Sequence, residues 1–96
     1  MGFVQIIEFR TSQPEELQAL GDKWLAATEG KRTMVRELIC ADRDDPGHYV
    51  EVVEFDSYES AMKNSELPET QQIAEEMTKL CDGPMRFLNL DVVASH

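Results

Sequence analysis

A few side chains in this sequence of 96 residues could do chemistry, and they lie far apart in the chain. Trp24 could stack on a flat ligand and offer its indole N–H, although a Trp on an apolar helix face also suits a core. Asn64 could bind a ligand through its amide or cap a helix. His48 could act as an acid or base near neutral pH, or be an exposed turn residue. Tyr58 suits packing with a satisfied hydroxyl. These four residues are our candidates for a ligand pocket, and no residue is assigned a catalytic role.

Three acidic side chains, Glu8, Glu37 and Glu51, fall within predicted strands. We expect them to form ion pairs with Arg10, Arg36 or Arg86, which also fall within predicted strands. The alternative is that two of these carboxylates face one cavity and act there as acid and base.

Complete signatures of known chemistry are missing from the sequence. We find no Ser/His/Asp or Cys/His arrangement, no phosphate-binding glycine loop, and no Cys/His cluster with zinc spacing. Cys40 and Cys81 are each set in an apolar pattern, which is typical of buried free thiols in a reducing cytosol. We therefore predict a cytoplasmic protein that needs no metal and no cofactor.

The size and charge of the chain limit its partners. Ninety-six residues suit one domain over positions 1–96. The net charge of −10 opposes binding to nucleic acid and to anionic membranes. The first ten residues, MGFVQIIEFR, read as a strand rather than a signal peptide, and no apolar run reaches membrane-spanning length.

The elements that must position these side chains follow from apolar periodicity. Alternation predicts strands over 3–10, 33–41, 49–55 and 85–93, and the second and third of these should form an antiparallel hairpin. Spacing of three and four predicts helices from about 14 to 29, over 56–65 and over 68–81, with a break at Leu67–Pro68.

Helix starts and one interior glycine carry further expectations. Ser12 with Glu15, and Asp56 with Glu59, have capping-box spacing. Gly21 lies in the middle of the first helix, where it costs about 1 kcal/mol relative to Ala. The close approach of another backbone would explain its presence.

The order β-α-β-β-α-β is that of a ferredoxin-like α+β fold, with a four-stranded antiparallel sheet and both helices on one face. The strands are nevertheless apolar on both faces. The uncovered face needs a partner, and a second copy of the chain is the simplest one. We therefore expect a homodimer that packs through its sheet faces.

The stretch YVEVVEFDSYESAM, the broken helix after it, and the pattern F-x-N-x-D-V at 87–92 resemble the dimeric α+β barrel superfamily. Within it, the antibiotic-biosynthesis-monooxygenase-like proteins are the nearest match. The resemblance covers the whole chain. It implies a barrel built from the two sheets of a dimer, and a small cavity between the sheet and the helices of each subunit.

What the resemblance implies for chemistry is mixed. Heme-degrading members need an Asn on the first strand, where this chain has Gln5 or Glu8, and a Trp and a His in the second helical region, which has neither. Other members carry a His late in the short helix; Asn64 takes that place, and it can donate a hydrogen bond to an oxyanion. Quinone-forming members use Trp, Tyr and Asn in the cavity.

Two hypotheses follow. The protein is a cofactor-independent monooxygenase acting on a small aromatic or polyketide-like molecule, or it is a non-enzymatic dimer with a structural role or one that binds a small hydrophobic ligand. An open cavity that contains Trp24 and Asn64 together would favour the enzyme. A cavity filled by side chains would exclude it; those side chains are Leu17, Met62, Ile73 and Phe87.

Overall fold

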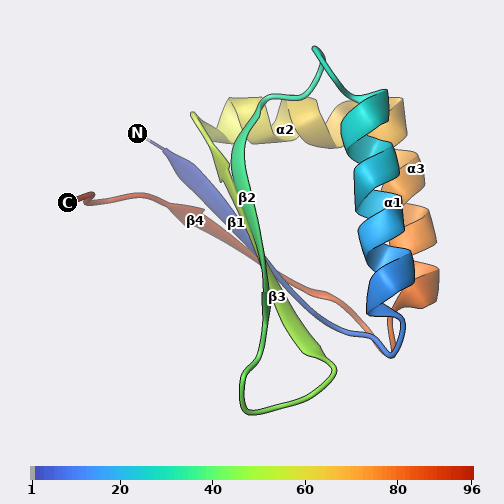
Figure 1. Ribbon diagram of the computed structural model, residues 1–96. Coiled ribbons are helices and arrows are strands. Elements are labelled where there is room, and N and C mark those ends of the chain that lie inside the picture. Colours follow the sequence, from blue (N-terminus) through green and yellow to red (C-terminus); the bar gives the residue numbers. More distant parts are fainter. Residues whose placement is uncertain (1) are drawn as a thin grey trace.

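The computed structural model describes residues 2–96, in the order β-α-β-β-α-α-β (Figure 1). The strands are β1 (Phe3–Arg10), β2 (Met34–Ala41), β3 (His48–Phe55) and β4 (Arg86–Asp91). The helices are α1 (Pro14–Ala27), α2 (Tyr58–Glu66) and α3 (Pro68–Leu80). The predicted break at Leu67–Pro68 separates α2 from α3.

The strands form a four-stranded sheet in the order β2-β3-β1-β4, and all neighbouring pairs are antiparallel. The three helices lie on one side of this sheet, with α1 and α3 side by side and α2 across one end (Figure 1). The predicted α+β, ferredoxin-like fold is confirmed.

Strand register separates the sheet residues into two faces. Gln5 is opposite Val53 and Asn89, and Ile7 is opposite Glu51 and Phe87, so these residues share the face toward the helices. Apolar residues also line the opposite, outer face; they are Val4, Ile6, Leu38, Val50, Val52, Leu88 and Leu90. No described helix covers that face, as the sequence predicted.

The buried core is small and lies at the end of the sheet near α2. Phe3, Val53, Phe55 and Ala61 form it, and Met34 and Met62 pack against it. Toward the other end, Phe9 stacks on Tyr49 with ring centroids 5.7 Å apart. Because this cluster lies at one end of the sheet, it does not fill the space between the middle of the sheet and the helices α1 and α3.

Both predicted capping boxes are wrong. Helix α2 is capped by Ser57, whose hydroxyl accepts a hydrogen bond from the Ser60 backbone N–H at 3.1 Å. Helix α1 follows Gln13, which makes no side-chain cap. The Thr11 hydroxyl instead accepts from the Gln13 N–H at 3.0 Å and donates to the Leu80 carbonyl at 2.7 Å. One threonine thus serves the helix start and ties the end of β1 to the end of α3.

Other expectations need smaller corrections. Helix α1 ends at Ala27 rather than near Glu29, with Thr28 as its C-cap, and the Thr28 hydroxyl donates to the Trp24 carbonyl at 2.7 Å. Cys40 is exposed and Cys81 is only partly buried, so they are not two buried thiols. Within residues 2–96, no helix is both long and apolar enough to cross a membrane.

Candidate functional site

A cavity of about 710 Å³ lies between the helix-facing side of the sheet and the helices. Trp24 from α1 and Asn64 from α2 both line it. Leu17, Ile73 and Phe87 form parts of its wall rather than filling it, and Met62 packs against the core instead. The structure therefore has an open cavity that contains both Trp24 and Asn64, which is the arrangement that favours an enzyme.

Trp24 forms a fixed wall of the cavity. Its side chain is 8% exposed, and its indole Nε1–H donates to the Thr70 hydroxyl of α3 at 2.9 Å. The Arg32 guanidinium lies over the ring, 5.9 Å from its centroid. Because Thr70 already accepts the indole N–H, Trp24 offers a ligand its ring rather than a hydrogen bond.

Asn64 is a buried polar group of the cavity, at 6% exposure. Its Oδ1 accepts a hydrogen bond from the backbone N–H of Thr33 at 3.2 Å, and the Thr33 hydroxyl donates to the Ser60 carbonyl at 2.5 Å. Since a backbone N–H can only donate, this contact fixes which end of the amide is oxygen. None of residues 2–96 accepts a hydrogen bond from Nδ2, so its two N–H groups are available to a ligand.

Glu37 and Glu51 also line the cavity, on neighbouring strands β2 and β3. Burial raises the pKa of Glu51 to about 9, and a hydrogen bond and the negative charge from Glu37 add to the shift. The expectation of ion pairs therefore holds for Glu8, which lies 4.0 Å from Arg86, and is wrong for these two. Arg36 pairs with Glu54 at 3.4 Å on the outer face, away from Glu37.

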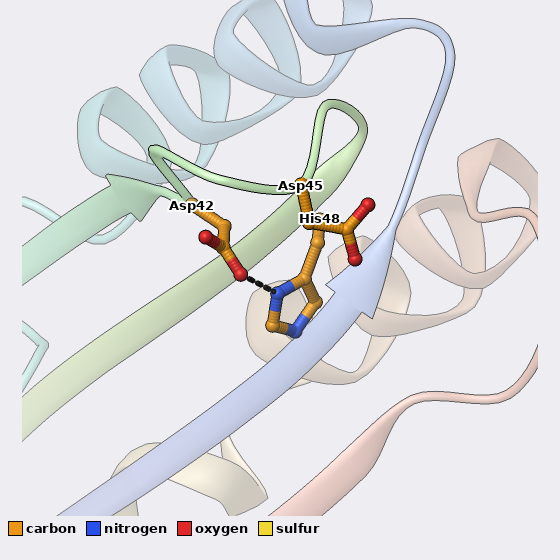
Figure 2. A group of neighbouring side chains, drawn as sticks. All are labelled: Asp42, Asp45 and His48. Atoms are coloured by element: carbon orange, nitrogen blue, oxygen red, sulfur yellow. Dashed lines mark hydrogen bonds and ion pairs between the residues drawn. The ribbon is translucent and has the colours of Figure 1, made fainter.

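His48 lies at the end of the β2–β3 hairpin and does not line the cavity (Figure 2). Its Nδ1 is 2.8 Å from Asp42 Oδ2, and this hydrogen bond lowers the pKa of Asp42. Asp42 also accepts from the Asp44 backbone N–H at 2.9 Å, which shapes the turn. His48 is thus part of the hairpin turn.

Asp42, Asp45 and His48 together have the residue types and spacing of a cation site, with ligand atoms within 4.8 Å of one another (Figure 2). Asp45, however, forms an ion pair with Arg10 at the end of β1. Because the Arg10 guanidinium already pairs with Asp45 and the His48 ring bonds to Asp42, both carboxylates of the cluster have protein partners. The cluster holds the hairpin against β1.

Tyr58 is 51% exposed and does not line the cavity. Its ring packs edge-on against Phe3 with centroids 5.4 Å apart, in the packing role that the sequence suggested. The structure thus brings together two of the four predicted pocket residues, Trp24 and Asn64, and separates His48 and Tyr58 from them.

Sequence reasoning did not find the two threonines that hold the site. Thr70 binds the Trp24 indole and Thr33 binds the Asn64 amide. Neither contact leaves a signal in the sequence, because the first joins residues 46 positions apart and the second joins residues 31 positions apart. The Glu37–Glu51 pair did have a sequence signal. Strand alternation places Arg36 and Glu37 on opposite faces, so Glu37 is turned away from the nearest arginine in the chain.

Comparison with known proteins supports the fold. SnoaB, a cofactor-independent oxygenase from Streptomyces nogalater, is 14% identical and has a TM-score of 0.82, covering 98% of this chain and 95% of its own. Rv0793 from Mycobacterium tuberculosis is 15% identical with a TM-score of 0.80, covering 99% and 98%. A structure described as antibiotic biosynthesis monooxygenase is 15% identical with a TM-score of 0.77, covering 98% and 100%.

No protein-family model and no curated protein matches the sequence. The likeness to solved structures therefore establishes the fold: this chain has the architecture of the antibiotic-biosynthesis-monooxygenase-like proteins. SnoaB was also solved as an asparagine-to-alanine variant, with a TM-score of 0.83 and 14% identity to this chain.

Proposed function

We propose that this protein is a cytoplasmic homodimer that acts as a cofactor-independent monooxygenase on a small aromatic or polyketide-like molecule. The observation that carries the proposal is that Trp24 and Asn64 line one open cavity, and that no residue from 2 to 96 accepts a hydrogen bond from the Asn64 N–H groups. The shared fold with a cofactor-independent oxygenase supports it.

In such a reaction the substrate itself supplies the electrons. An electron-rich ring loses a proton and gives an enolate or phenolate, which attacks dioxygen. A ring CH₂ that becomes C=O loses two hydrogens and takes one oxygen atom, while the other oxygen atom leaves as water. Asn64 would donate hydrogen bonds to the developing oxyanion, and Trp24 would hold the flat ring by stacking.

The second candidate is a ligand-binding dimer without catalysis. It is favoured by the position of His48, which lies on the hairpin rather than in the cavity. Under this alternative, Trp24 and Asn64 bind a hydrophobic ligand that is released unchanged.

The test is oxygen consumption with hydroxylated anthrones as probe substrates, with isotopically labelled dioxygen to follow oxygen into the product. Asn64→Asp keeps an acceptor for the Thr33 N–H but loses the N–H donors, so we expect turnover to fall by about 10²-fold. Asn89→Asp is the matched control: Asn89 also accepts a hydrogen bond, from Gln5 at 3.1 Å, but does not line the cavity.

Two results would argue against the enzyme. In the first, the anthrones bind to the protein but none of them is oxidised faster than it is without protein. The other is an equal fall in turnover in both variants, because a specific role for Asn64 requires the two to differ.

A further inference from the structure

The cavity contains two carboxyl groups that no described residue pairs with a positive charge. Glu37 is opposite Val53 and Glu51 is opposite Ile39, so the two side chains are diagonal neighbours on one face of adjacent strands. Both line the cavity. Within residues 2–96, neither takes part in an ion pair.

The other titratable groups that face the cavity do not supply a positive charge. They are Asp22 from α1 and Tyr49 from β3, and the cavity residues from β1, β4, α2 and α3 are uncharged. No Lys, Arg or His belongs to the described lining. Arg32, which does not line the cavity, lies over the Trp24 ring and donates to the Leu25 carbonyl at 2.8 Å.

The protonation of the pair reflects this missing charge. Burial, together with the hydrogen bond and charge of Glu37, raises the pKa of Glu51 far enough that the pair retains one proton near neutral pH. A group that holds a proton for want of a counter-ion will release it when a cation arrives.

A second polar feature of the same cavity points to a ligand. The Asn64 side chain is 6% exposed, its oxygen is bound by Thr33, and its Nδ2 has no acceptor among the described residues. Among the described residues, Nδ2 is not one of the fully buried side-chain atoms that lack a partner. Its N–H groups are therefore open to the cavity, which presents a donor as well as two acidic groups.

We infer that Glu37 and Glu51 form a binding site for a positively charged amine on an aromatic ligand, whose ring lies against Trp24 and whose acceptor oxygen is bound by Asn64. The inference rests on the proposed function in that it uses the same cavity, and it specifies the substrate as an amine-bearing aromatic molecule. On binding, the ammonium group takes the place of the shared proton, which passes to the solvent.

Calorimetric titration of the full-length protein with three naphthalenes tests this assignment. Naphthylmethylammonium, naphthylmethanol and naphthoate share the ring and differ in charge. Near pH 7 the amine stays protonated, and we expect it to bind about tenfold or more tightly than the alcohol, with naphthoate weakest. In buffers of different ionisation enthalpy, only the ammonium compound should release a proton.

Variants locate the effect. Glu51→Gln should weaken binding of the ammonium compound by about tenfold and abolish proton release, while binding of the alcohol stays unchanged. Glu54→Gln is the control on the same strand, since Glu54 pairs with Arg36 on the outer face; it should behave like the unmodified protein. Thermal unfolding of each variant confirms that it is folded.

Equal binding of the ammonium compound and the alcohol would overturn this inference and leave the proposed function standing. If the Glu51→Gln variant still binds the ammonium compound more tightly than the alcohol, that result would also overturn this inference and leave the proposed function standing. If none of the three naphthalenes binds, the cavity is not a ligand site and both proposals fail. Ammonium binding with proton release, but without oxidation of any substrate, would support this inference and the non-catalytic alternative.

Discussion

At the scale of single residues, Glu51 makes stability depend on pH in an unusual direction. Its pKa in the folded state is raised from 4.5 to about 9. Between these values the unfolded chain loses a proton that the folded chain keeps, so the free energy of unfolding falls as pH rises. Below this window both states are protonated, and above it both are ionised.

Glu51→Gln removes this titration, and we therefore expect the variant to be more stable than the unmodified protein near pH 8 and equally stable near pH 4. Urea unfolding at the two pH values measures the difference. Asp42, whose pKa is lowered, contributes to both proteins and cancels in the comparison. A gain in stability that is the same at both pH values would show that repacking, rather than titration, is responsible.

The site residues also show how far sequence reasoning reaches. Trp24 and Asn64 were found because an indole and an amide have an evident use in a pocket. For Glu37 and Glu51 the sequence suggested ion pairs with arginines of the strands, with two carboxylates facing one cavity as the alternative, and the structure places both in the cavity. Strand alternation explains why Glu37 does not pair with Arg36. The two residues are neighbours in the chain but lie on opposite faces of the sheet.

At the scale of elements, strands were predicted better than helix ends. Alternation predicted β1 over the observed range and β2 and β3 to within a residue, whereas β4 is shorter at both ends than predicted. The helix caps were missed because capping boxes are local patterns, and the caps observed depend on neighbours. Thr11 serves α1 while binding Leu80, which is 69 residues away.

A partly buried hydrogen bond joins α1 to α3, and an exposed ion pair joins the segment that follows α1 to α3. The bond is from the Trp24 indole to Thr70, and the ion pair joins Lys31 Nζ to Glu69 at 2.5 Å. Thr70→Val leaves the indole N–H without its acceptor, so we expect a loss of about 1–2 kcal/mol in the free energy of unfolding. Glu69→Gln, the control, should change it by less than about 0.5 kcal/mol.

Urea unfolding followed by the fluorescence of Trp24, the one tryptophan of the chain, measures both variants. If the free energy of unfolding falls equally in the two variants, the buried hydrogen bond contributes no more than the exposed ion pair to the packing of α1 on α3.

At the scale of the whole molecule, the outer face of the sheet remains the strongest indication of a dimer. Leu38 and Leu90 are 41% and 45% exposed there, and no described helix covers them. A contiguous apolar face of this kind is typical of an interface. The proposed homodimer would bury it sheet against sheet.

Leu38→Glu places a charge on this face, and we expect it to convert a dimer into a monomer at micromolar concentration. Sedimentation velocity measures the mass. Gln72→Glu, on an exposed position of α3, adds the same charge away from the sheet and should leave the mass unchanged. A monomeric unmodified protein would refute the dimer directly.

Gly21 affects both the stability of α1 and the space inside the cavity. It lines the cavity, and a Cβ built there would meet no atom within 4 Å, so the close backbone approach that we expected does not occur. In mid-helix an alanine would stabilise α1 by about 1 kcal/mol. The absent side chain instead leaves room beside Trp24. We therefore expect an alanine at position 21 to stabilise the protein and to narrow the range of ligands that fit the cavity.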